Sequence, residues 1–467
     1  MSNQIDRRRF LASGAALAGM ASVAGVEAKA ESRAARAVVT RVRYSAFDPG
    51  ANLESYRKGV TQMKQWGEED ATDPRGWEYQ AAIHKSRRPD NGIFNQCPHG
   101  SWWFFPWHRA YLFYFEQIIR EASKDDNFNL PYWDWDAEGR KSLPPQFRNP
   151  QSELFDARRS GPLNGGAPLP TAETDADEAL GTPEFLGPRR RPGFGGVILP
   201  YQQRYQGPIE SGVHDNIHGE IGHGGDMSHL ETAALDPIFW LHHCNIDRLW
   251  DIWLSGGRSN PPDTDWKDNR VNGQRRPWVF FDGKRVKREV VTSDFLPGSP
   301  LMDYRYDDLR GHSQSLLADS GLRERLRDDH RVMMMAPNPQ FANQVKTMQQ
   351  NVFGAEDRVL VTSGVNGITL GPAPITVKAE IKEDKRSALM QALPFAAQMK
   401  PDSPAILLNV ENVRAANSPG ISYRVFLNQP DATAETNTSE SNYLGSIGLF
   451  LGQDGGHEDM PGGARNF

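Results

Sequence analysis

Two clusters of histidine are the residues of this chain best suited to carry chemistry. Each cluster offers three imidazoles and almost no thiolate, which predicts two metal ions rather than one. The first cluster consists of His84, His99 and His108, and the second consists of His214, His218 and one member of the adjacent pair His242 and His243.

The type of ligand narrows the choice of metal. All-imidazole sites suit copper, zinc, iron or nickel. A structural zinc site is usually closed by four ligands and recruits cysteine, whereas each set of histidines here stops at three. The open position that this leaves on each metal favours a reactive site, and we expect copper in both positions.

The spacing within the second cluster predicts helical turns. His214 and His218 are four residues apart, so their imidazoles project from one face of a helix, as in zinc proteases. The glutamate that such a protease needs is missing, because Asp215 follows His214. His243 and Asp247 share the same spacing. This predicts that the Asp247 carboxylate accepts the second ring N–H of His243 and fixes its tautomer.

Two segments around these histidines, His99–Glu116 and Asp236–Asp247, resemble the copper signatures of tyrosinases and polyphenol oxidases, the type-3 dinuclear copper family. The resemblance extends from about Ala81 to the C-terminal end. Adjacent helical side chains diverge by about 100°, so only one of His242 and His243 faces a metal, and the family pattern selects His243. Carried over by position, the resemblance implies two copper ions, one held by His84, His99 and His108 and the other held by His214, His218 and His243.

Cys97 stands two residues before His99. In fungal tyrosinases a Cys-x-His sequence of this form becomes a thioether that joins the sulfur to the imidazole. The resemblance therefore implies a covalent link between Cys97 and His99, which would hold the ligand rigidly while copper changes valence. The other cysteine, Cys244, is expected to be a small buried hydrophobe beside His243.

Three further positions bear on substrate choice through the resemblance. Glu210 matches a glutamate proposed in this family to position a water that deprotonates monophenols. In this family an asparagine usually partners this glutamate, but the corresponding residue here is Asp215. Two nearby carboxylates repel each other when both are ionised, so one of them is expected to have a raised pKa and to act as the base. The alternative is that both are solvated groups outside the ligand shell. Leu230 aligns with a phenylalanine that often lies over copper in plant catechol oxidases, so we expect phenols to enter more freely here.

The elements that must position these residues are predicted to be mainly helical. The segments Trp107–Ser123 and Asp236–Trp253 are dense in aromatic and aliphatic residues, as in buried helices. With the helices that carry His84 and His214/His218, they are expected to form a four-helix bundle that holds the copper pair. Residues 145–207 are rich in Pro, Gly and Arg, which predicts long loops over the bundle.

Composition divides the chain into further regions. Residues 31–310 are expected to form the copper catalytic domain, and residues 311–371 a linker broken by Pro and Gly. Residues 372–467 contain short β-like runs such as 375–381, 405–410, 422–427 and 444–451, which predict a β-sandwich-like domain. This domain resembles the C-terminal domain of plant polyphenol oxidases, which shields the active site in latent forms.

The first thirty residues read as an export signal. Arg7–Arg9 precede an apolar stretch that is rich in alanine and glycine, and small residues follow at Ala28–Ala30. This order is typical of twin-arginine signals and predicts a periplasmic or secreted bacterial protein with no membrane anchor after cleavage. The net charge of −6, with both signs mixed along the chain, gives no reason to expect a nucleic acid partner. The oligomeric state is left open.

The resemblance implies a polyphenol oxidase that uses O2 to convert o-diphenols to o-quinones, and it leaves open the ortho-hydroxylation of monophenols. An o-aminophenol oxidase is an alternative that differs only in substrate. A haemocyanin-like oxygen carrier is an alternative of a different class, with the same copper pair and no turnover. The expected export of a solitary chain argues against the carrier, because carriers work in large assemblies.

Overall fold

Helix α3 (Phe104–Ser123) shows how the sequence builds the core. Its side chains are apolar or aromatic on nearly every side, and nearly all of them are buried, as expected for a helix that is hydrophobic all round. Pro106 is tolerated because it lies in the first turn, where no intrahelical N–H is needed. The helix ends where Lys124 adopts a left-handed conformation with φ of 57°.

The computed structural model describes residues 41–187, 193–196 and 206–309, and then residues 373–378, 409–410, 422–433, 436, 443–448 and 465–466. The predicted export signal (residues 1–30) and the predicted linker (residues 311–371) lie outside the described residues. Among the helices in the described ranges, none is long and apolar enough to cross a bilayer.

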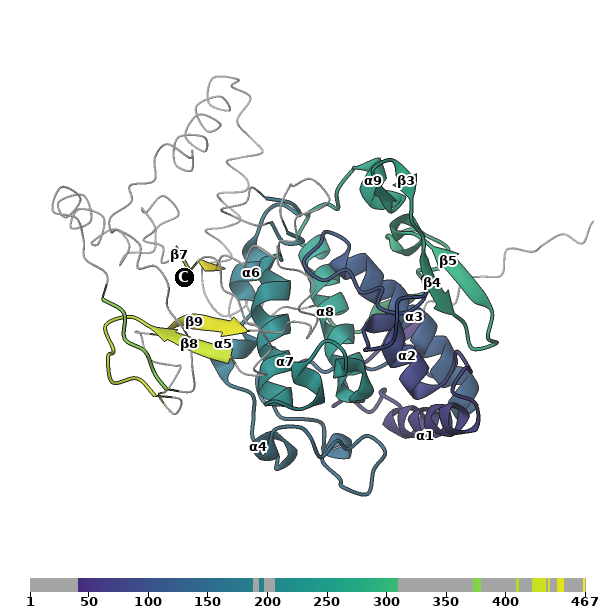
Figure 1. Ribbon diagram of the computed structural model, residues 1–467, viewed down its shortest axis with the longest axis horizontal. Helices are drawn as coiled ribbons and strands as arrows, with labels where there is room; N and C mark the ends of the chain where they lie inside the picture. The colour runs from purple at the N-terminus through teal and green to yellow at the C-terminus, as the bar shows by residue number, and fades with distance from the viewer. Residues whose placement is uncertain are drawn as a thin grey trace, which may run out of the picture. The chain divides into compact units, whose positions relative to one another are not determined.

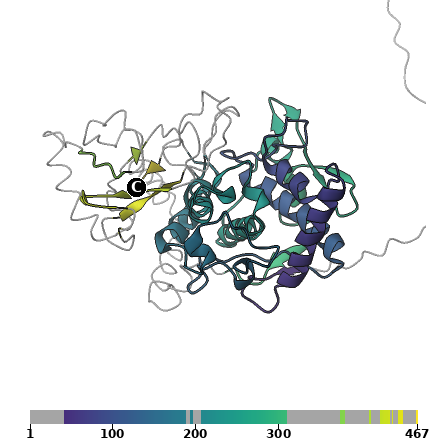
Figure 2. The same cartoon turned by 60° about the horizontal axis from the view of Figure 1, so that its bottom comes forward.

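Helices carry most of the candidate ligands, as the sequence predicted (Figure 1). These helices are α2 (Trp77–His84), α3, the π-helical turn η2 (Glu210–His214), α7 (Asp215–Gly222) and α8 (Ile238–Ser255). Helix α3 packs against α8 and also against α1 (Leu53–Glu69), which the sequence analysis did not predict and which lies on the outside of the group in Figures 1 and 2. The stacked rings of Phe115 and Trp240, with centroids 3.4 Å apart, join α3 to α8.

The turn before α7 differs from the regular helix that the spacing of His214 and His218 predicted. Within η2, Gly212 has φ of −93° and ψ of −111°, outside the helical region. π-Helical turns of this kind are often found at functional sites, and glycine lowers the cost of the distortion. The two imidazoles still lie together, with ring centroids 4.6 Å apart.

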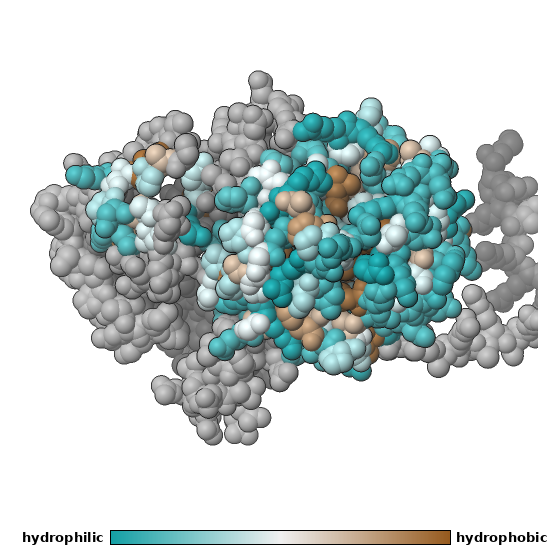
Figure 3. Space-filling model, turned by 90° about the horizontal axis from the view of Figure 1, so that it is seen from below, coloured by the Kyte–Doolittle hydropathy of each residue, from teal (hydrophilic) through white to brown (hydrophobic). Residues whose placement is uncertain are grey.

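The remaining core consists of short helices and paired strands. Residues 145–207 were predicted to be long loops, but their described part also contains short helices. The short helices of the core are η1 (Pro145–Phe147), α4 (Gly161–Asn164), α5 (Thr171–Thr174), α6 (Asp177–Gly181), η3 (Asp226–Ser228), η4 (Ala233–Leu235), α9 (Thr264–Lys267) and η5 (Thr292–Phe295). On the face shown in Figure 3, the described surface is mostly hydrophilic, with small apolar patches between the polar side chains.

The strands of the core form two-stranded sheets. β2 (Arg270–Val271) pairs with β3 (Gln274–Arg275), and β4 (Trp278–Phe281) with β5 (Lys287–Val290), both antiparallel. β1 (Arg41–Arg43) pairs in parallel with β6 (Tyr304–Tyr306), with Arg43 opposite Tyr306. The pair β1–β6 therefore brings the two ends of the core together.

In the C-terminal region, strands are present at three of the predicted runs, 405–410, 422–427 and 444–451. β8 (Ser422–Phe426) pairs antiparallel with β9 (Tyr443–Gly448), and β7 (Asn409–Val410) pairs antiparallel with β10 (Arg465–Asn466). The described part of the predicted strand at 375–381, residues 375–378, contains no strand. The β-sandwich itself stays a prediction.

Candidate metal centre

The first histidine group is assembled from two helices and the loop between them. His84 is the last residue of α2, His108 lies early in α3, and both are buried, whereas His99 lies in the loop and is partly exposed. The ring centroids of His99 lie 5.0 Å from His84 and 5.5 Å from His108. Together with Cys97, these residues offer ligand atoms that all lie within 4.8 Å of one another.

The second histidine group is buried and entirely helical. His214, His218, His242 and His243 offer ligand atoms within 4.8 Å of one another. The ring centroid of His214 lies 4.6 Å from that of His218 and 5.0 Å from that of His243. The Nε2 atoms of His218 and His243 approach to 3.3 Å, so these two rings point at the same place.

The two groups face each other across a short gap. The rings of His108 and His243 stack with centroids 4.1 Å apart and planes 14° from parallel. The ring of Phe104 lies 4.6 Å from His108 and 4.9 Å from His214, while that of Phe239 lies 4.3 Å from His243. The geometry therefore suits two adjacent metal ions between aromatic walls, as the sequence predicted.

Hydrogen bonds at Nδ1 set the tautomers of four imidazoles. A carbonyl or carboxylate oxygen only accepts, so an Nδ1 that bonds to one must carry the proton and leave the Nε2 lone pair for a metal. These bonds join His84 to the carbonyl of Leu230 at 3.2 Å, His108 to that of Phe104 at 2.8 Å, His218 to that of Met227 at 2.8 Å, and His214 to the carboxylate of Asp215 at 2.8 Å.

His242 has the opposite arrangement. The indole N–H of Trp135 donates to His242 Nδ1 at 3.2 Å, so Nδ1 must be the acceptor. In the neutral ring the proton then sits on Nε2, which has no lone pair to offer a metal. This hydrogen bond favours His243 over His242 as a ligand, in agreement with the choice that the family pattern implied.

His84, His108, His218 and His243 are in the protonation state that metal binding requires. Burial lowers the pKa of His84 to about 3. Burial, followed by the neighbouring imidazoles, also lowers the pKa of His108, His218 and His243 well below the usual value. The rings are therefore neutral at neutral pH, as ligands must be. Nε2 of His84 is buried and has no hydrogen-bond partner in the described part of the chain, so these residues fit a metal.

Asp247 does not take the role that its spacing predicted. Its Oδ1 accepts the Nε–H of Arg109 at 2.6 Å, and its Oδ2 accepts the hydroxyls of Tyr304 and Tyr306, each at 2.6 Å. Nδ1 of His243 is buried and has no hydrogen-bond partner among the described residues. The donors from distant segments therefore reach the carboxylate and the imidazole does not. Sequence reasoning missed these donors.

Asp215 instead provides the carboxylate that orients an imidazole, that of His214. Its other oxygen, Oδ2, accepts the side-chain amide of Gln206 at 3.0 Å. Glu210 is also buried, and its Oε1 accepts the backbone N–H of Gly100, the residue after His99, at 2.6 Å. Both carboxylates are buried, so the alternative of two solvated groups is wrong. The adjacency of Asp215 to His214 was the sequence signal for its contact.

The remaining predicted residues lie close to the first group. Sγ of Cys97 is 3.7 Å from Nε2 of His99 and 3.4 Å from Nε2 of His108, so the sulfur touches both imidazoles. The side chain of Leu230 is partly buried against the core. Its contact with His84 is made by the backbone carbonyl, which no substitution of the side chain removes.

The comparisons with known proteins agree with this geometry. The common central domain of tyrosinase matches residues 74–193 and 199–255, which include every candidate ligand. A domain of unknown function, DUF7868, matches residues 358–460. The described helices that carry histidine thus coincide with the matched domain.

Individual relatives match over part of their length. Tyrosinase HcTyr1 of Hahella sp. (strain CCB-MM4) is 35% identical over 54% of this chain and 60% of its own length. The latent form of polyphenol oxidase from Prunus armeniaca is 30% identical over 55% of this chain and 46% of its own length. The chain therefore spans about half the length of the curated relatives it matches. The structure of latent aurone synthase, a polyphenol oxidase, has a similar fold, with a TM-score of 0.53 and 19% identity over 92% of this chain and 82% of its own.

Proposed function

We propose that this chain, whose central part is a tyrosinase-family domain, is a polyphenol oxidase that uses O2 to convert o-diphenols to o-quinones. One copper ion would be held by His84, His99 and His108, and the other by His214, His218 and His243. The observation that carries the proposal is the stacking of His108 on His243, which places the two groups side by side. When bound, copper supplies the redox chemistry with O2.

The residues of the chain would supply geometry and a dry pocket. The hydrogen bonds at Nδ1 hold four of the six proposed ligands in the ligating tautomer, so these rings need little reorganisation when the metal binds. The rings of Phe104 and Phe239 lie against both groups and exclude water from the region between them. A flat phenol ring would be bound by stacking on these aromatic and imidazole surfaces.

For monophenols, we propose Glu210 as the residue that receives the phenolic proton, through a water molecule. Its support is position: Glu210 comes from η2, beside the second group, and binds the N–H of Gly100, beside the first. A buried carboxylate between the two imidazole groups is a suitable base. Asp215 is occupied by His214 and Gln206, so we assign it to orientation and not to proton transfer.

Oxidation of catechol by copper-loaded protein tests the proposed function. Two copper ions per chain and the appearance of o-quinone absorbance are expected. Tight binding of copper and O2 without turnover would favour the oxygen carrier, and rapid oxidation of o-aminophenol with slow oxidation of catechol would favour the aminophenol oxidase. A protein without copper affinity would contradict the proposal altogether.

We further propose that the C-terminal region shields the site and that the chain is exported. In support of shielding, β8 and β9 contact α7, and Arg424 of β8 lies 3.7 Å from Glu220 of α7 and 4.0 Å from Glu173 of α5. Brief proteolysis between residues 311 and 371 is expected to raise catechol oxidation several-fold while copper is retained. Unchanged activity after clean removal would contradict shielding. Export is tested by sequencing the mature N-terminus, expected near Ala30, after expression in a bacterium with a twin-arginine pathway.

A further inference from the structure

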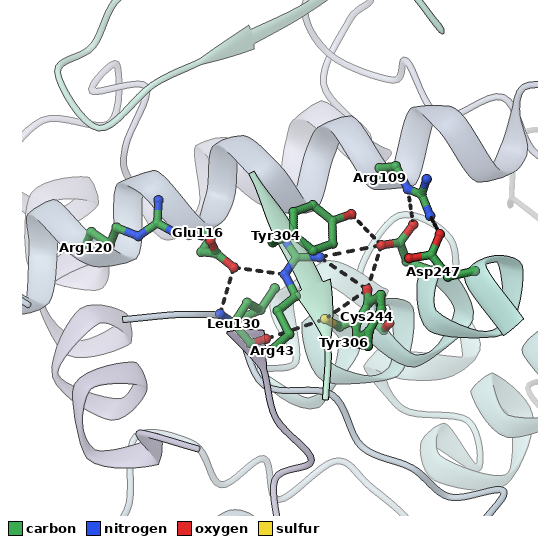
Figure 4. A network of polar contacts seen from close by, with 10 residues as sticks. Arg43, Arg109, Glu116, Arg120, Leu130, Cys244, Asp247, Tyr304 and Tyr306 are labelled. Carbon is green, nitrogen blue, oxygen red and sulfur yellow. Dashed lines mark hydrogen bonds and ion pairs between the residues drawn. The ribbon is translucent and has the colours of Figure 1, made fainter. Parts of the chain in front are cut away.

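Asp247 is the centre of a buried network of polar side chains, shown in Figure 4. Its carboxylate accepts hydrogen bonds from Arg109, Tyr304 and Tyr306, and Nη1 of Arg43 lies 3.5 Å from it. Asp247 is 2% exposed and Arg109 is fully buried. A carboxylate with this many donors has its position fixed in every direction.

The network joins the two helices that each carry one ligand of a different metal group. Arg109 directly follows His108 on α3, and Asp247 lies one helical turn after His243 on α8. His108 and His243 are the two imidazoles that stack across the gap between the groups. The ion pair of Arg109 and Asp247, 2.6 Å long, therefore connects the turns that present these two rings.

We infer that Asp247 and Arg109 are positioning residues that set the separation of the two metal groups. The inference uses the proposed function only in taking both groups to hold copper. The Asp247 carboxylate acts on the helices and not on a ligand ring, since it makes no hydrogen bond to His243. Without it, α3 and α8 would still pack through their aromatic residues, but the register of one ligand set against the other would be free to change.

The shape of Arg109 suits this role. Its Nε donates to Asp247, and its Nη2 donates to Asp251 one turn further along α8, also at 2.6 Å. Its guanidinium lies 4.0 Å from the centre of the Trp250 ring. A planar guanidinium held at two edges and one face cannot rotate. Translation and rotation of α3 along α8 are therefore both resisted at the turn that carries His108.

On its outer side, the network is completed by residues from the two strands at the ends of the core, β1 and β6. The hydroxyls of Tyr304 and Tyr306 come from β6, and Arg43 comes from the paired strand β1. The Arg43 guanidinium lies 3.5 Å from the centre of the Tyr304 ring and bonds Glu116 of α3 at 3.0 Å. The strand pair thus holds Asp247 from the side opposite Arg109, so the carboxylate has no room to swing away from it.

Electron paramagnetic resonance of the copper-loaded, oxidised protein tests the inference. Two Cu(II) ions held as one close pair couple magnetically and give little signal, whereas ions that are displaced from each other give the signal of isolated Cu(II). In Asp247→Asn, at least half of the bound copper is expected to give the electron paramagnetic resonance signal of isolated Cu(II), while the copper content stays near two per chain. A variant that holds two coppers and remains silent would overturn the inference.

Asp236→Asn is the matched control. Asp236 lies two residues before the start of α8 and forms a buried ion pair with Arg159, with N–O distances of 2.5 and 2.8 Å. It is therefore equally buried and equally paired, but it does not join α3 to α8. This variant is expected to melt at a lower temperature and to remain silent. The same isolated signal from Asp236→Asn would attribute the effect to general loosening, and would also overturn the inference.

A second variant covers the case in which Asp247→Asn does not fold. Arg109→Lys keeps the charge, but one ammonium group cannot bond both Asp247 and Asp251. A signal of isolated Cu(II) smaller than that of Asp247→Asn is therefore expected. The absence of any such signal would overturn the inference. The wild-type protein separates this outcome from failure of the proposed function. If the wild type does not bind two coppers, the proposed function fails; if it binds a silent pair and the variants do so too, only the positioning role fails.

Discussion

The two histidine groups hold their imidazoles in different ways. In the first group, His99 comes from a loop, is partly exposed, and shares its surroundings with the thiol of Cys97. In the second group every imidazole comes from a helical turn and is buried, and the carboxylate of Asp215 orients His214. The second group is therefore set by the fold, whereas the first depends on a loop that needs another constraint. The sulfur of Cys97 is placed to provide it.

The largest effect is expected from removing a ligand of the group that the fold sets. His243→Ala should lose about one of the two copper ions per chain and abolish catechol oxidation, because a site with two imidazoles loses both affinity and geometry. His242→Ala is the matched control, since the hydrogen bond from Trp135 keeps the proton of the His242 ring on Nε2. It should retain both copper ions. Equal copper loss in the two variants, measured by atomic emission, would mean that His242 is also a ligand.

The next largest effect concerns Glu210, the residue that spans the two groups. Glu210→Gln should lower monophenol turnover by about 100-fold, the usual contribution of a general base, and diphenol turnover much less. Asp215→Asn is the comparison, because it alters the orientation of His214 and should weaken copper binding without changing the ratio of the two activities. A parallel fall of both activities in Glu210→Gln would remove Glu210 as the base.

Cys97 tests whether the loop of the first group needs a covalent constraint. A thioether to His99 forms a sulfur–carbon bond and removes one hydrogen from each side chain, with copper and O2 as the oxidant. The joined peptide should be two hydrogens lighter in mass spectrometry. Cys97→Ser should weaken copper binding roughly tenfold, as the loss of support around a ligand does, and Cys244→Ser should not. A free thiol at Cys97 in the copper-loaded protein would contradict the link.

The smallest effect is expected at Leu230. Its carbonyl holds His84 and is unchanged by substitution, so copper content should stay at the wild-type value. The resemblance places this side chain over a copper ion, so Leu230→Phe should hinder bulky phenols and raise their KM by roughly threefold, about the effect of a small misfit in an apolar pocket. Leu230→Met keeps the volume and serves as the control. An identical KM for all three proteins would place Leu230 away from the substrate.

Aromatic density and local spacing were enough to predict the long helices α3 and α8, but not α1 or the short helices within residues 145–207, and the full grouping of the histidines came from the family resemblance. The pairs His214/His218 and His243/Asp247 each lie within one helical turn, so their relative positions follow from the sequence alone. The partners of Asp247 were beyond such reasoning, because Tyr304 and Tyr306 come from a strand more than fifty residues away. The distorted turn at Gly212 was missed because helical periodicity does not distinguish a π turn from an α turn. The tautomer of His242 required the position of Trp135, which is set by tertiary packing.

The parallel pairing of β1 with β6 has a consequence for how the protein is made. Arg43 and Tyr306, whose side chains bond within the network around Asp247, are 263 residues apart in the chain. Contacts between such distant segments form late, because the loop between them must close first. A ribosome must therefore have released Tyr306 before the spacing between the helices α3 and α8 is fixed, although both helices emerged long before. The network around Asp247 is thus completed only after residue 306 has been made, later than the synthesis of every histidine that it helps to position.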